Sequence, residues 1–111
     1  MPKRDAELLI EDILESGAKI IEYTKGLTFD QFVSDSKTID AVVRNFEIIG
    51  EAANRLPIEF KELHHQIDWH RIRGFRNRIV HHYFGIDYNI VWQIIESFLP
   101  GMLKQISDLK R

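Results

Sequence analysis

The sequence predicts an all-α protein, a compact antiparallel bundle of about five helices in a single domain spanning residues 1–111. Apolar residues recur at the spacing of a helix along almost the whole chain. No stretch alternates between apolar and polar residues for long enough to form a strand. Of the 111 residues, 44% are apolar, enough to build one hydrophobic core without a disulfide or metal ion to reinforce it.

The first helix is expected over residues 5–25, and Gly26 ends it because glycine readily adopts the left-handed conformation that follows a helix. Thr28 and Gln31 have the spacing of a capping box, which predicts a short second helix. The apolar face of the first helix includes Leu9, Ile13 and Ile20.

A third helix is expected over residues 37–56, with Pro57 as its stop because proline lacks the backbone donor that a helix interior needs. Residues 58–67 are expected to form a short helical turn. The apolar face of the third helix consists of Ile39, Val42, Val43, Phe46, Ile49 and Ala53.

The last part of the chain predicts two more helices. Asp68 caps one that ends near Phe84, with Gly85 as its stop. Asp87 caps the other, which continues to about residue 109. This last helix should bend near Pro100, whose ring removes a backbone hydrogen bond from the preceding turn.

Charge is unevenly distributed, although the formal net charge of the whole chain is only -2. Residues 1–68 carry 14 acids and 8 bases, whereas residues 69–86 carry four arginines, three of the five histidines and no acid. Such a patch suits a partner that carries phosphate groups. The mildly acidic whole argues against a dedicated non-specific nucleic-acid binder.

Several classes of protein are excluded by composition. Without cysteine the chain has no disulfide, thiolate nucleophile or cysteine-ligated metal site. Its unbroken apolar runs are too short for a membrane span or a signal-peptide core, so we expect a cytoplasmic protein. The adjacent histidines at 64–65 and 81–82 point about 100° apart on a helix and lack further ligands nearby, so no metal or other cofactor is expected.

Residues 76–83 read Arg-Asn-Arg-Ile-Val-His-His-Tyr. The first arginine, the first histidine and the tyrosine of this run fit the pattern of HEPN-domain ribonucleases: arginine, four residues, histidine, any residue, tyrosine. The runs at residues 44–53 and 84–92 are similar to the same proteins. The chain therefore resembles the HepT-like family over most of its length, which implies that it is a single HEPN domain.

This resemblance implies the toxin of a toxin–antitoxin system whose partner is a minimal nucleotidyltransferase antitoxin. It implies a metal-independent endoribonuclease that cleaves RNA with Arg76 and His81 as catalytic residues. Arginine can hold two phosphate oxygens at once, and histidine can move protons near neutral pH, so both side chains suit the reaction. The resemblance further implies that the partner attaches AMP to Tyr83 and thereby switches the toxin off.

The spacing of the two catalytic residues raises a geometric question. On a regular helix Arg76 and His81 lie five residues and about 140° apart, so they would not converge. Either the helix opens before His81, or Arg76 of one subunit works with His81 of another across a two-fold axis. We favour the homodimer, because Gly74 lies on a polar stripe of the predicted helix and offers a surface for close approach.

Other charged and polar residues have two interpretations each. The arginines and the neighbouring polar residues either contact RNA or form a solvated face. The two glutamates on the third helix either pair with Arg44 and Arg55 or orient Arg73 or Arg76. Arg76 itself could be a surface arginine paired with an acid of the third helix. The auxiliary candidates are Arg73, Asn77, Arg78, His82, Glu47 and Glu51.

A rival function belongs to a different class. The chain could be a catalytically silent HEPN module that binds a nucleotide or docks the nucleotidyltransferase through the same basic surface. The intact triplet of Arg76, His81 and Tyr83 favours catalysis, since a docking module needs none of the three together.

Overall fold

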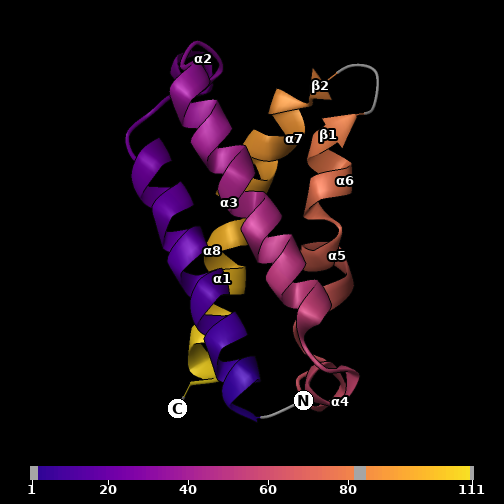
Figure 1. Cartoon of the computed structure of the whole chain (residues 1–111). Coiled ribbons are helices and arrows are strands. Elements are labelled where there is room, and N and C mark those ends of the chain that lie inside the picture. Colours follow the sequence, from indigo (N-terminus) through magenta and orange to yellow (C-terminus); the bar gives the residue numbers. More distant parts are fainter. Residues whose placement is uncertain (1–2, 82–84, 111) are drawn as a thin grey trace.

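A computed structural model describes residues 3–81 and 85–110, and for Lys3, Arg4 and His81 it describes the backbone alone. The predicted all-α bundle is confirmed (Figure 1). The long helices α1 (Lys3–Thr24) and α3 (Ser36–Arg55) lie side by side and antiparallel. In the described part of the chain, no helix is both long and apolar enough to cross a membrane.

The connection between the two long helices has the structure that the sequence predicts. Gly26 has a φ of +79°, the left-handed conformation expected after α1. Helix α2 (Phe29–Val33) opens with the predicted capping box: the Gln31 amide donates to Thr28 Oγ1 over 3.1 Å, and Gln31 Oε1 accepts from the Thr28 amide over 2.9 Å. These contacts satisfy donors that a helix start otherwise leaves unpaired.

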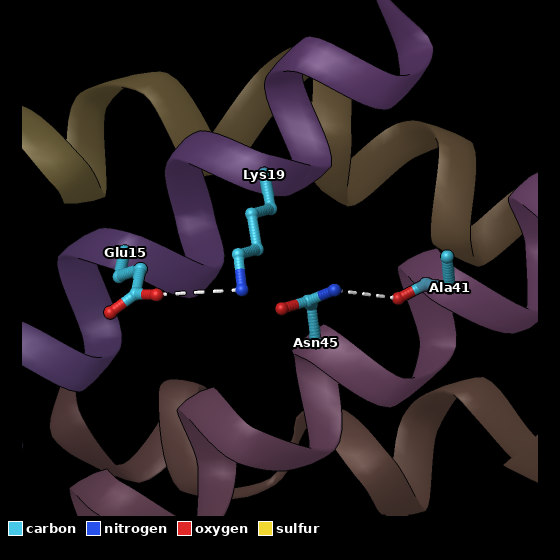
Figure 2. A network of polar contacts seen from close by, with 4 residues as sticks. All are labelled: Glu15, Lys19, Ala41 and Asn45. Carbon is cyan, nitrogen blue, oxygen red and sulfur yellow. Dashed lines mark hydrogen bonds and ion pairs between the residues drawn. The ribbon is translucent and has the colours of Figure 1, made fainter.

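Apolar packing holds α3 against α1 on one side and against the segment that contains Phe75 on the other. Every residue of the predicted α3 stripe is buried, including Phe46, whose ring meets Phe75 edge-on at 5.3 Å between centroids. Figure 2 shows two polar contacts beside this packing, Glu15 to Lys19 over 3.4 Å and Asn45 Nδ2 donating to the Ala41 carbonyl over 2.8 Å. Each contact lies within one helix, so neither links α1 to α3.

Beyond α3 the elements are short. Helix α4 (Ile58–Leu63) is the predicted turn, and α5 (Trp69–Arg73) and α6 (Phe75–Ile79) follow along the side of α3 that lies away from α1 (Figure 1). Asp68 caps α5 as predicted, since its Oδ1 accepts the Arg71 amide over 3.0 Å. Strands β1 (Val80–His81) and β2 (Gly85–Ile86) then pair antiparallel.

The prediction of one helix from Asp68 to Phe84 is wrong. The helix breaks at Gly74, which has φ −84° and ψ 1°, and ends at Ile79, because Val80 is extended at φ −106° and ψ 118°. Ile79 and Val80 are both β-branched, and such residues are less favourable in a helix. The Ile79 carbonyl accepts a hydrogen bond from the Asp87 amide over 2.8 Å, which links the helix end to the segment after β2. The two-residue pair also corrects the expectation of no strand, and Phe84 lies outside the described residues.

The last predicted helix is confirmed with an interruption. Asp87 Oδ1 accepts the Ile90 amide over 3.1 Å and caps α7 (Tyr88–Gln93). A π-helical turn, η1 (Ile94–Phe98), separates α7 from α8 (Leu99–Asp108), and the Leu99 amide donates to the Ile94 carbonyl five residues back. The interruption is a wider helical turn that ends just before Pro100, and the bend expected there stays a prediction.

Gly50 on α3 permits the close approach of the α5 backbone. A Cβ atom there would lie 3.3 Å from the Arg73 carbonyl oxygen at the end of α5. A Cβ on Gly74 would meet backbone oxygens of α5 itself, the nearest being that of His70 at 3.3 Å. Gly74 therefore marks the break between α5 and α6, and Gly50 marks the close approach to a neighbouring element.

Candidate functional site

The charged residues of the motif lie on a short helix with one buried face. Phe75 and Ile79 of α6 point into the core. Arg76 and Arg78 are both exposed, and because they lie two residues apart they project about 200° from each other around the helix. They therefore line two separate hollows, which we name the Arg76 groove and the Arg78 groove.

The Arg76 groove, of about 450 Å³, runs between α6, α3 and α1. Its charges balance, with three arginines and three acids. Within the residues that the structure describes, none of these six side chains makes a hydrogen bond or an ion pair. Its lining consists of Leu9, Asp12, Arg44, Glu47, Ile48, Glu51, Ala52, Arg55 and Arg76.

This arrangement bears on the two interpretations of the α3 glutamates. Glu47 and Glu51 share the groove with Arg76, whereas Arg73 does not reach it. Glu47 is half-buried and Glu51 is exposed. Among the described residues Arg76 has no direct carboxylate partner, so it is free to meet a ligand in the groove.

The Arg78 groove, of about 700 Å³, is strongly basic. It contains three arginines against a single acid, Asp68, and that acid already caps α5. The guanidinium carbon of Arg71 lies 4.1 Å from the centroid of the Phe98 ring, a cation–π contact that fixes its position. The lining consists of Asn54, Asp68, His70, Arg71, Arg73, Gly74, Asn77 and Arg78.

The structure thus groups the predicted residues differently from the sequence pattern. Arg73, Arg76 and Arg78 are close neighbours in the sequence, yet in the structure Arg76 lines one groove and Arg73 and Arg78 line the other. Asn77 joins Arg73 and Arg78. Sequence reasoning missed Asp12 and Asn54, which come from distant helices and which no local pattern marks.

His81 lies on β1, where its backbone pairs with Gly85. The helix has already ended at Ile79, so the separation of about 140° expected for Arg76 and His81 on one regular helix does not apply here. His82 and Tyr83 lie outside the described residues.

The remaining histidines offer no metal centre in the part of the chain that is described. No group of three or more metal-ligating side chains comes together there. The ring of His64 instead lies 4.7 Å from that of Phe60, and its carbonyl accepts the indole nitrogen of Trp69 over 3.0 Å.

Comparison with known proteins places the chain in one family. Residues 13–109 match the family described as ribonuclease HepT-like. A protein of Methanocaldococcus jannaschii named "Putative RNase" is 41% identical over 98% of this chain and 90% of its own length. A protein of Thermococcus cleftensis named "Probable ribonuclease HepT" is 36% identical over 98% of this chain and 99% of its own.

A third relative, from Caldanaerobacter subterraneus subsp. tengcongensis, is also named "Putative RNase" and is 41% identical over 90% of this chain and 89% of its own length. No solved structure matches the chain. Because the family match covers most of the chain, including the 76–83 motif and the whole lining of the Arg78 groove, the chain belongs to the HepT-like ribonuclease family.

Proposed function

We propose that the chain is a metal-independent endoribonuclease whose catalytic residues are Arg76 and His81. Membership of the HepT-like family supports a ribonuclease function. The observation that carries the site is the exposed Arg76 in a groove of about 450 Å³, without a carboxylate partner among the described side chains. An arginine in this state can bind the scissile phosphate.

The chemistry needs few parts. The 2′-hydroxyl of RNA attacks the adjacent phosphorus, and the bond from phosphorus to the 5′-oxygen breaks. His81 moves a proton between these oxygens, and Arg76 stabilises the extra negative charge of the phosphorane. Glu47 and Glu51 line the same groove without an ion pair to Arg76, and their charges balance that of the arginine until RNA arrives.

We propose that the protein works as a homodimer. The end of α6 before His81 removes the helical objection to a site within one subunit, so the two arrangements need a direct test. Mixing the Arg76→Ala and His81→Ala proteins provides it. A site shared across the two-fold axis regains one intact copy in the mixed dimer, whereas a site within one subunit stays inactive in the mixture.

We further propose that the ribonuclease is the toxin of a two-component cytoplasmic system. Its partner is a minimal nucleotidyltransferase antitoxin that attaches AMP to Tyr83, and the added group blocks the RNA site. Co-expression should add the mass of one or more AMP units to the wild type and none to Tyr83→Phe. Full neutralisation without added mass would show that the partner acts by covering the site.

The decisive experiment for the function is RNA cleavage by the purified protein with a chelator present. Wild-type protein should cleave, and Arg76→Ala and His81→Ala proteins with unchanged circular dichroism should not. Cleavage that stops with chelator and returns with zinc would contradict the metal-free mechanism. A well-folded wild type that cleaves no RNA but binds the nucleotidyltransferase would favour the silent docking module.

A further inference from the structure

The Arg78 groove is larger and more basic than the groove that holds the proposed catalytic arginine. The one acid in its lining is Asp68, whose Oδ1 already accepts a hydrogen bond from the Arg71 amide over 3.0 Å. Arg73 and Arg78 are exposed and make no ion pair with any described residue. Two arginines that make no ion pair and lie in a hollow with one acid are available to bind an anion.

Positive charge extends beyond the groove lining. Lys61 donates to the Ala53 carbonyl over 3.1 Å at the end of α3. Its pKa lies below the ordinary value for lysine, first because it is partly buried and second because the charge of Arg73 is close. The positive charges of Lys61 and Arg73 therefore lie close enough to repel each other.

Several side chains of the groove carry hydrogen-bond donors. Arg71 is stacked on Phe98, and its Nε atom is buried without a hydrogen-bond partner. Arg73 Nη2 lies 3.4 Å from His70 Nδ1. Asn54 and Asn77 add amide groups to the lining. Guanidinium and amide donors together are the groups that contact phosphate and sugar oxygens in nucleic-acid interfaces.

The two grooves lie on opposite faces of one short helix. A helix with its side chains is about 10–12 Å across, so a strand that crosses α6 can meet Arg76 on one side and Arg78 on the other. We propose that the Arg78 groove binds backbone phosphates of single-stranded RNA beside the cleaved bond, as a positioning site separate from the Arg76 groove. This inference rests on the proposed ribonuclease function.

On this proposal the two grooves have different roles, one in binding the strand and the other in cleaving it. The Arg78 groove recognises the charge of the strand without reading its bases, since phosphate contacts carry no sequence information. It holds the strand in place while the reaction occurs on the other side of α6. Arg73 and Arg78 are therefore positioning residues, and replacing them should mainly raise KM.

Fluorescence anisotropy with a labelled 2′-O-methyl oligoribonucleotide tests the groove, because this probe lacks the attacking hydroxyl and cannot be cleaved. The variants are Arg73→Gln, Arg78→Gln and the double variant. Lys19→Gln on α1 is the matched control, since it removes one positive charge outside both grooves. Thermal melting of each protein checks that the fold is intact.

Each single groove variant should bind the probe about tenfold more weakly at low salt, the effect of one charge-assisted hydrogen bond. The plot of log affinity against log salt should lose about 0.7 of its slope for each phosphate contact removed. Lys19→Gln should match the wild type. In cleavage assays the groove variants should raise KM more than they lower kcat.

Wild-type slopes in both groove variants would overturn the inference while leaving the ribonuclease intact. Variants that bind RNA normally but lose affinity for the nucleotidyltransferase would overturn it too, by assigning the groove to an acidic protein surface. A wild type that never cleaves RNA would fail the proposed function, and the binding slopes would still decide whether the groove holds RNA.

Discussion

The two grooves beside α6 differ in charge although one short helix separates them. The Arg76 groove balances three arginines against three acids, whereas the Arg78 groove sets three arginines against one acid that is already a helix cap. In a ribonuclease this difference separates two tasks. A basic groove attracts the strand, and a balanced groove keeps its arginine from binding every phosphate equally, so that stabilisation can be greater in the transition state.

The strongest test of this contrast is the loss of the arginine in each groove. Arg76→Ala should lower kcat by about a hundredfold or more, because a charge contact made in the transition state is removed. Arg78→Gln should act mainly through KM. Single-turnover cleavage at saturating RNA measures the difference, and an equal fall of kcat in both proteins would erase the distinction between the grooves.

The position of α5 on α3 can be disturbed through one glycine. Gly50→Val should lower the free energy of unfolding by about 2 kcal/mol, because its side chain would press on the Arg73 carbonyl. Gly101→Val is the matched control: its site on α8 is open, and the change should stay within about 0.5 kcal/mol. Urea unfolding measures both, and equal stabilities would mean that α5 moves away freely.

Replacing acids of the Arg76 groove with neutral residues should make its charge resemble that of the Arg78 groove. Removing the negative charges of Glu47 and Glu51 with glutamine leaves three arginines and one acid there. The double variant should bind the uncleavable probe about tenfold more tightly, with a steeper salt dependence and a lower kcat. If kcat stays at the wild-type value, the charges of the two glutamates do not influence Arg76.

The smallest expected effect lies far from both grooves. The pKa of Asp35 is lowered first by the Thr38 hydroxyl, which donates to it over 2.7 Å, and then by the Thr38 amide. A carboxylate whose pKa is lower in the folded state stabilises the fold above its unfolded pKa, and this contribution is lost as pH falls through the folded value, below 3.8.

Asp35→Ala should therefore reduce stability at neutral pH and flatten the acid limb of the unfolding curve, while cleavage per folded molecule stays the same. Thermal melts between neutral and acidic pH give the first result, and kcat gives the second. A fall in kcat would mean that the start of α3 influences the grooves at its other end.

The sequence predicted the long helices well because their signals are local. The capping box at Thr28 and the apolar stripe of α3 depend on nearby residues, and both appear as expected. The prediction of one continuous helix after Asp68 failed for a physical reason. Ile72, Phe75 and Ile79 keep the spacing of one helix and are all buried, so the break at Gly74 leaves no trace in the apolar period.

The candidate site was only partly predictable. Arg76 was identified from the motif, but the sequence does not show that its close neighbours Arg73 and Arg78 lie in a different groove. The packing of α3 against α5 and α6 divides them, and this packing brings Asp12 and Asn54 from distant helices. A pattern within one segment does not contain that information.

The number of residues in the π-helical turn η1 determines where Phe98 points, and Phe98 contacts an arginine of the Arg78 groove. Phe98 at its end packs against Phe75 at 5.7 Å between ring centroids and carries the Arg71 guanidinium on its face. Deleting one residue from the turn would restore an ordinary helix and rotate Phe98 by about 100°, away from both α5 and α6. We therefore expect substitutions in this turn to disturb the fold less than a change in its length, which would displace the contacts of Phe98 with α5 and α6 together.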